Sequence, residues 1–231
     1  MKKSSKNINN EWISFADLMT ILLIIFVMIS ASYGIQKHKT IQEIQILQNE
    51  IYEALNNEFK DDLDKWSAQI DPQDATVSFT GYNLVQFKQG SSEIEDKFQS
   101  VLDDFFPRYV SVIKKFDRDI RRLRIEGHTS SEWGRFESED DRYLNNLDLS
   151  QRRAFNVLKY CLNTLWFPEK KWIKKKLGSE GLSSSQLIKN DFGYEDKKRS
   201  RRTVFKIDIK HGDYYLNNPQ NNLYTKLGAV Q

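Results

Sequence analysis

The chain has little cysteine and little excess charge. Its 231 residues include one cysteine, Cys161, which excludes an internal disulfide and any metal site built from clustered cysteines. We therefore expect Cys161 to pack as a small apolar residue on a helix. The formal net charge of +3 is too small to indicate a nucleic-acid-binding protein. No internal repeat is visible.

Motifs of the common enzyme classes are also missing. The sequence has no nucleophile elbow, phosphate-binding loop, metal-ligand spacing or helix with paired carboxylates. The acidic segment at residues 130–144 could bind a cation such as calcium, but its spacing matches no EF-hand loop. We therefore expect neither enzymatic activity nor a cofactor.

Only one segment, residues 12–33, is apolar for long enough to cross a membrane. At ~1.5 Å per helical residue it spans ~33 Å, about one bilayer core. A cleaved signal peptide would look similar, but the small-residue cleavage site is poorly formed at residues 29–32. We therefore predict a transmembrane helix over residues 12–34, preceded by a tail over residues 1–11.

Lysines flank this segment unequally. Lys2, Lys3 and Lys6 precede it, whereas Lys37 and Lys39 follow it. The slight excess on the N-terminal side favours an N-terminus in the cytoplasm. In a bacterial cell the chain would then be a single-pass protein of the inner membrane, with its C-terminal domain in the periplasm.

One charged residue, Asp17, lies about one turn inside the apolar run. An ionised carboxylate at that depth costs at least ~2.5 kcal/mol, so it needs a partner, a proton or a polar cavity. Thr20 lies three residues further along the same helix face. We interpret Asp17 and Thr20 as an ion-translocation site for H⁺ or Na⁺. Alternatively, the span begins at Leu18 and Asp17 lies among the lipid headgroups, which leaves a short span over residues 18–33.

Residues 35–70 are predicted to form an amphipathic linker helix. No proline or glycine occurs between Gly34 and about Trp66, and apolar residues recur at steps of three and four. These residues are Ile41, Ile44, Leu47, Ile51 and Leu55. The pattern is compatible with a short coiled coil, with a helix that lies on a partner, or with a solvated stalk.

The remaining sequence predicts one globular domain over residues 71–211 and a polar tail over residues 212–231. Apolar periodicity and turn residues divide the domain into strands and helices. The expected elements are strands at 75–79, 82–87, 121–129 and 203–210, helices at 98–116 and 149–166, and the acidic loop at 130–144. This order predicts an α/β fold, a sandwich with a mixed sheet.

Sequence motifs occur at the expected ends of these elements. Gly127-His128-Thr129 ends a strand, and residues 146–154, NLDLSQRRA, open a helix. Residues 178–181, GSEG, are expected to form a turn, and residues 200–204, SRRTV, are expected to start the last strand. Together they resemble the OmpA/MotB peptidoglycan-binding domain family, and the resemblance covers roughly residues 76–210. It implies the α/β fold of that family and peptidoglycan as the ligand.

The resemblance also implies which residues bind. In the family, an arginine at the position of Arg153 binds the carboxylate of diaminopimelate in the peptide stem, a role that a planar guanidinium suits. Asn146 and Leu149 would shape the same pocket, and Ser150 would cap the helix and offer backbone N–H groups to an anion. Alternatively, Arg153 is an ordinary surface arginine. His128 is expected to be a turn residue whose ring hydrogen-bonds within the loop.

The chain departs from the family directly after Thr129. The family usually has an aspartate there, which binds the ammonium group of the ligand, but this chain has Ser130. Thr129 and Ser130 are assigned to the site by their position in the motif. The loop that follows, residues 131–145, is longer than usual and acidic, and it could supply the missing charge. The candidates are Glu132, Asp140 and Asp141.

A single span that carries an aspartate, placed before such a domain, resembles MotB, the wall-anchored subunit of an ion-driven stator. The start WISFADLM, the GHTSSEW turn and the chain length are more similar to the MotB-like subunits of Zorya anti-phage systems. That resemblance implies a dimer of this chain inside a ring, a pentamer, of polytopic MotA-like subunits, with ion flow through Asp17. A flagellar stator subunit and a passive wall tether are the alternatives.

Overall fold

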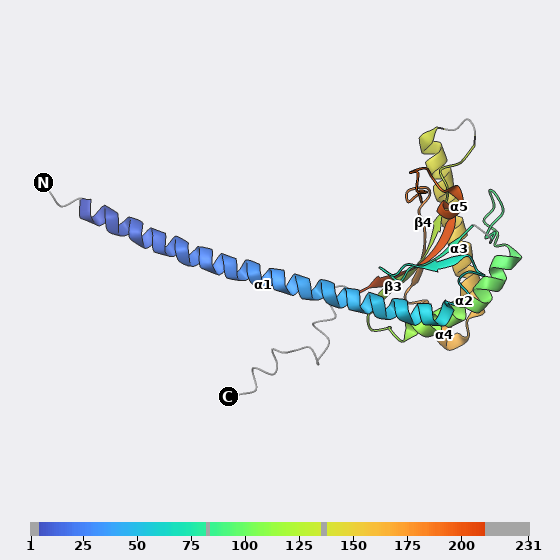
Figure 1. Cartoon of the computed structure of the whole chain (residues 1–231), viewed down its shortest axis with the longest axis horizontal. Coiled ribbons are helices and arrows are strands. Elements are labelled where there is room, and N and C mark those ends of the chain that lie inside the picture. The colour runs from blue at the N-terminus through green and yellow to red at the C-terminus, as the bar shows by residue number, and fades with distance from the viewer. Residues whose placement is uncertain (1–4, 82–83, 135–137, 211–231) are drawn as a thin grey trace. The chain divides into compact units, whose positions relative to one another are not determined.

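A computed structural model of the chain describes residues 5–81, 84–134 and 138–210 (Figure 1). Four expectations fall wholly or partly outside these ranges. They are residues 1–4 of the N-terminal tail, the polar tail at 212–231, Tyr82 as the start of a strand, and Glu137 as part of the acidic loop. The chain divides into two compact units, residues 1–44 and residues 45–231, and the second unit contains all the described strands.

Helix α1 (Ser5–Phe59) begins in the first unit and contains the apolar segment. Among the described residues it is the one helix that is long and apolar enough to span a membrane. Its large apolar side chains are exposed there, among them Leu22 and Phe26. The helix continues through Gly34, so neither the boundary expected after residue 11 nor the one expected after residue 34 coincides with a helix end.

The last turns of α1 belong to the second unit and to its hydrophobic core. Ile51, Leu55 and Phe59 are fully buried there. The helix ends at Phe59, earlier than predicted, and a turn leads from it into the first strand of the sheet. In this part, the stripe that predicted a coiled coil or a stalk packs inside the chain's own domain. The compact unit therefore begins near residue 45, earlier than the predicted start at residue 71.

Five strands form one mixed sheet in the order β1-β2-β5-β3-β4. The strands are β1 (Ala68–Ile70), β2 (Val77–Thr80), β3 (Ile120–His128), β4 (Leu177–Gly181) and β5 (Arg202–Ile209). Strands β3 and β4 are parallel, and the other neighbouring pairs are antiparallel. The predicted α/β sandwich with a mixed sheet is confirmed. The turn predicted at residues 178–181 is wrong, because these residues pair with β3 as part of strand β4.

The strand expected at residues 82–87 is not present in the described part of that segment. Phe87, in this segment, forms only an isolated antiparallel β-bridge with Ile94. The reason is that β2 already pairs with β1 along one edge and with β5 along the other. No edge of β2 is left for a hairpin partner.

Helices α2 (Asp96–Lys114) and α3 (Glu139–Thr164) cover one face of the sheet (Figure 1). Aromatic rings join α2 to the strands. The ring of Phe105 lies 4.9 Å from that of Phe79 on β2 and 5.0 Å from that of Phe205 on β5, in edge-to-face contacts. Such contacts add to the burial of apolar area, so they fix α2 firmly on the sheet.

The crossover between the parallel strands β3 and β4 consists of α3 and the short α4 (Phe167–Ile173). A further short helix, α5 (Lys197–Ser200), precedes β5. Cys161 is fully buried on α3, as predicted, and burial raises the pKa of its thiol well above the usual value.

Helix α3 begins at Glu139, well before the start that the sequence predicts at Leu149. The hydroxyl of Ser138 caps it by accepting a hydrogen bond from the N–H of Asp141 at 3.1 Å. Glu139, Asp140 and Asp141 occupy its first turn, where the helix dipole favours carboxylates. Part of the expected acidic loop is therefore the start of a helix.

The other face of the sheet carries charged side chains. Leu123 and Ile125 of β3 point into the core, so the alternating residues Arg124 and Glu126 point away from it. The guanidinium of Arg124 lies 3.2 Å from Glu126, 2.8 Å from Glu180 on β4 and 3.0 Å from Asp208 on β5. This network joins three neighbouring strands.

Candidate functional site

Of the predicted site residues, Thr129, Ser130 and Asn146 lie where β3 and β4 end beside α3, whereas Arg153, further along α3, contacts residues 87–91. Thr129 and Ser130 directly follow β3, and each is only 3% exposed. The N–H of Thr129 donates to the carbonyl of Ser183, just after β4, at 2.9 Å. The chain segments after the two parallel strands are therefore held together at this end of the sheet.

Three predicted residues lie on one face of α3. Asn146, Leu149 and Arg153 are separated by three and four residues, which places them one above the other on the helix. All three are buried. The side-chain amide of Asn146 donates to the carbonyl of Glu132 at 3.4 Å. This bond brings the helix face next to the segment that contains Thr129 and Ser130.

Two glycines let α3 approach the strands this closely. A Cβ atom on Gly181 would lie 2.6 Å from the Cα of Gln151, and one on Gly127 would lie 3.1 Å from the carbonyl carbon of Ser150. Carbon atoms normally pack about 3.5 to 4.0 Å apart. Both positions therefore require glycine because helix and strand are in direct backbone contact.

Ser150 lies inside α3 and does not cap it, so the expected role as a cap is wrong. Its hydroxyl donates to the carbonyl of Leu147 at 2.9 Å and accepts from the N–H of Ser183 at 3.0 Å. The side chain of Gln151 accepts from the N–H of Gly181 at 2.7 Å. These two side chains fasten the helix to the end of β4, and no helix N-terminus is available there to bind an anion.

Arg153 is a buried cation held by backbone carbonyls. Its Nε donates to Ser91 at 2.8 Å, its Nη2 donates to Lys88 at 3.1 Å, and its guanidinium lies 4.9 Å from the centre of the Phe87 ring. Burial, together with the nearby Arg201, lowers the pKa of Arg153 to about 10. Arg153 is therefore still charged at neutral pH, and it is not the surface arginine of the alternative interpretation. Among the described residues no carboxylate pairs with it.

Ser130 lies beside a small cluster of charged residues. Its hydroxyl is 3.4 Å from Nη1 of Arg201, which also lies 3.4 Å from the carboxylate of Glu132. The same carboxylate pairs with Lys197 at 2.5 Å. Of the three candidate carboxylates, Glu132 is the one that shares a contact with Ser130, through Arg201. The other two, Asp140 and Asp141, lie in the first turn of α3.

Sequence reasoning missed three residues near the site. Arg201 belongs to the SRRTV motif, and its place in that motif is the signal that could have identified it. Phe87 and Glu195 lie in segments without a motif, and no sequence signal points to them. Glu195 accepts hydrogen bonds from the N–H and the hydroxyl of Ser131 at 3.0 and 2.5 Å.

His128 is the last residue of β3 and not a turn residue, so the expected hydrogen bond of its ring within the loop is wrong. The ring is buried, and its Nε2 lies 3.5 Å from the carboxylate of Glu126 on the same strand. Burial lowers the pKa of His128; Glu126 opposes this shift, and Arg202 adds to it. At neutral pH the imidazole is therefore uncharged.

The two residues assigned to ion translocation, Asp17 and Thr20, are exposed on α1. The hydroxyl of Thr20 donates to the carbonyl of Ala16 at 2.8 Å, and its oxygen can still accept or coordinate. Their role remains a prediction. In the described ranges no group of three or more His, Cys, Asp or Glu residues could hold a metal ion.

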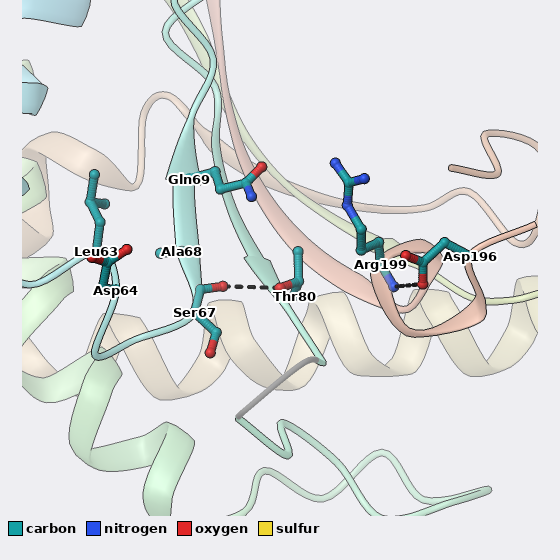
Figure 2. A pocket seen from close by; sticks show the side chains of 8 residues that line it. All are labelled: Leu63, Asp64, Ser67, Ala68, Gln69, Thr80, Asp196 and Arg199. Atoms are coloured by element: carbon teal, nitrogen blue, oxygen red, sulfur yellow. Dashed lines mark hydrogen bonds between the residues drawn. The ribbon is translucent and has the colours of Figure 1, made fainter. Parts of the chain in front are cut away.

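A separate hollow of about 430 Å³ lies between β1, β2 and the segment around α5 (Figure 2). The hydroxyl of Thr80 there donates to the carbonyl of Ser67 at 3.1 Å, and the carboxylate of Asp196 accepts from the N–H of Arg199 at 3.0 Å. Asp196 caps α5 in this way. The predicted site residues do not line this hollow, so it is distinct from the site on α3.

Comparisons with known proteins agree with this arrangement. Residues 86–203 match the OmpA family. The chain is 40% identical over 208 residues to the Zorya protein ZorB of Escherichia coli, an alignment that covers 86% of this chain and 88% of that protein.

Solved structures with similar folds include a putative MotB-like protein from Desulfovibrio vulgaris, with 20% identity and a TM-score of 0.49 over 73% of this chain and 95% of that one. The cell wall anchor of the T6SS from Pseudomonas aeruginosa has 22% identity and a TM-score of 0.47 over 68% of this chain and 97% of that one.

The family match includes the whole of α3 and the segments after β3 and β4, and thus every predicted site residue of the second unit. The relative matches over most of both chains. The chain therefore belongs to the OmpA family and, within it, is a homologue of the Zorya protein ZorB.

Proposed function

We propose that the chain is a peptidoglycan-binding, membrane-anchored subunit of a MotB-type, ion-driven motor complex that acts in Zorya anti-phage defence. The wall-binding part rests on Arg153. This guanidinium is buried at the site, is held in place by two carbonyls, and has no carboxylate partner among the described residues. A buried charge without a counter-ion is costly, so the site favours an anionic ligand.

The ligand group that we propose for Arg153 is a carboxylate of the peptide stem. The Nε and Nη2 atoms of Arg153 are occupied by Ser91 and Lys88, which fixes the plane of the guanidinium. Its Nη1 has no partner in the part of the chain that the structure describes, so it can donate to a carboxylate. The carboxylate of Glu132 would bind the ammonium group of the ligand in place of the usual aspartate. In the structure this carboxylate already pairs with Lys197 and Arg201.

The motor part rests on α1. A single span encloses no ion pathway, so ion flow through Asp17 requires a polytopic partner of the MotA type. Two copies of this chain are the simplest way to bring two Asp17 carboxylates near one axis, and a pentameric ring of partners would surround them. The N-terminus would lie in the cytoplasm and the second unit in the periplasm, bound to the wall. The transported ion is H⁺ or Na⁺, and the chain itself carries out no catalysis.

Co-sedimentation of the full-length protein with purified peptidoglycan sacculi tests the wall-binding part. Arg153→Ala should weaken binding about 10- to 100-fold, because hydrogen bonds to charged groups contribute ~1.5–3 kcal/mol. Arg153→Lys should recover only part of the affinity, since it keeps the charge but loses the planar fork. The matched control is Arg152→Ala, which removes a neighbouring exposed arginine paired with Asp148 and should bind like the wild type.

Thermal unfolding of each variant shows whether it is folded. A folded Arg153→Ala protein that sediments with sacculi as strongly as the wild type would contradict the proposal.

A further inference from the structure

We infer that residues 188–196, here called the aromatic loop, extend the wall site and stack Phe192 and Tyr194 on the sugar rings of a peptidoglycan glycan strand. The inference rests on the proposed wall-binding function and adds the saccharide part of the ligand to it.

The aromatic loop has a well-defined backbone. The backbones of Lys189 and Glu195 form an isolated antiparallel β-bridge at its base. At its tip, the side-chain oxygen of Asn190 accepts hydrogen bonds from the N–H of Phe192 at 3.1 Å and of Tyr194 at 3.0 Å. The backbone N–H of Asn190 donates to the carbonyl of Tyr194 at 2.8 Å. The two aromatic residues therefore sit on a tight turn, so little backbone entropy is lost when a ligand binds to them.

Both rings are presented to solvent. Phe192 is 84% exposed and Tyr194 is 74% exposed. A single exposed apolar residue is ordinary on a protein surface, whereas two exposed aromatic side chains on one turn offer two points of contact to a partner. Gly193 between them has a φ of +80°, a backbone conformation that favours glycine. No atom lies within 4 Å of the place where a Cβ would stand, so the surface at this point of the turn is open.

The aromatic loop is attached directly to the wall site. The carboxylate of Glu195 accepts both hydrogen bonds from Ser131, the residue after Ser130. Lys197, just beyond the loop, pairs with Glu132 at 2.5 Å. These contacts link the loop to the segment after β3, where Nη1 of Arg201 lies 3.4 Å from the hydroxyl of Ser130.

The chemistry of the patch fits a saccharide better than it fits a second stem peptide. In peptidoglycan the stem is joined covalently to the glycan strand, so a site that holds the stem has sugar rings close by. One face of a pyranose ring presents only C–H groups, which pack on the electron-rich face of an aromatic ring. Lys189 and Asp191, which are exposed in the same loop, can hydrogen-bond to hydroxyl and N-acetyl groups.

Two separate probes, each measured with the full-length protein, test the inference. One is soluble glycan strands freed of stem peptides by an amidase, and the other is the free stem peptide. The double variant Phe192→Ala with Tyr194→Ala should bind glycan strands at least about tenfold more weakly and the stem peptide as well as the wild type. Exchanging the two rings, as Phe192→Tyr with Tyr194→Phe, should keep glycan binding.

The matched control is Trp166→Ala, which removes an equally exposed aromatic residue (84%) just before α4. It should leave binding of both probes unchanged.

The probes separate this inference from the proposed function. Glycan binding that is lost in the double variant but kept in Arg153→Ala supports the inference even if stem binding fails. Stem binding through Arg153 without any glycan binding keeps the proposed function and overturns the inference. A double variant with unchanged glycan affinity also overturns it, and a changed oligomeric state in that variant would assign the rings to a contact between copies of the chain.

Discussion

The hydroxyl oxygen of Ser150 lies 2.8 Å from the point where a side-chain carbon on Gly181 would stand. This oxygen also accepts a hydrogen bond from the N–H of Ser183, two residues after Gly181. The hydroxyl of Ser150 therefore joins α3 to the end of β4. The position of Arg153, one turn along α3, depends on that contact.

Gly181→Ala should therefore destabilise the domain by about 1–3 kcal/mol, because the added methyl group meets helix backbone that cannot move aside. It should also weaken sacculus binding, since α3 must shift with Arg153. Chemical denaturation and co-sedimentation measure the two effects. Gly178→Ala on the same strand is the control: its Cβ would meet only the flexible side chain of Arg122, at 3.1 Å, and should change stability by less than ~0.5 kcal/mol. Equal stabilities of the two variants would argue against the close contact.

A fragment that begins at residue 45 should fold, whereas one that begins at residue 71 should not. The shorter fragment lacks the buried Ile51, Leu55 and Phe59 together with β1. Loss of each large core side chain costs ~2–5 kcal/mol, so the loss of three costs about as much as the whole stability of an ordinary domain, ~5–15 kcal/mol. Circular dichroism during thermal unfolding distinguishes the fragments. A cooperative transition of the shorter fragment at the same temperature as the longer one would refute the inclusion of α1 in the core.

The domain should lose stability as the pH falls below about 6.5, through His128. Its pKa in the folded state lies below the ordinary value of 6.5, so between these two values the unfolded chain binds a proton that the folded chain does not. The effect fades within about one pH unit above 6.5, and by pH 5.5 it amounts to at most about 1.4 kcal/mol. Urea unfolding at pH 7.5 and 5.5 should show a smaller loss for His128→Gln, because the other titrating groups are the same in both proteins. An identical loss would show that His128 is not responsible.

Asp17→Asn should abolish protection against phage while the complex still assembles, because the amide keeps the size of the side chain but cannot exchange an ion. Plating efficiency with the intact operon measures protection, and a swimming assay alongside separates a defence motor from a flagellar stator. Protection at the wild-type level would remove the motor hypothesis and favour the passive tether.

Apolar periodicity and motif matching predicted different parts of the structure. Periodicity predicted β3, α2 and β5 because their buried residues recur at regular steps, as Leu123 and Ile125 do. It did not predict the end of α1, since an apolar stripe at helical spacing looks the same whether it packs on a partner or on its own domain. Motif matching led to Arg153 and Asn146, which are both buried on α3.

The contacts of the site could not have been predicted in the same way. Ser150 looks like a helix cap in the sequence, but the capping Ser138 lies a full three turns earlier, outside any motif. The bonds from Arg153 to Ser91 and Lys88 join residues more than sixty positions apart. Only the folded chain brings these groups together, which is why the structure is needed to show that Arg153 is buried and has no carboxylate partner within residues 5–81, 84–134 and 138–210.

The burial of Cys161 has a practical consequence. Thiol-reactive probes attack the thiolate, and this sole cysteine is both inaccessible and kept protonated by its surroundings. A new cysteine placed on the surface, for instance in place of Ser185 near the aromatic loop, would therefore be the single labelling site without any need to remove the native one. A fluorophore or spin label attached there could report wall attachment in the intact protein.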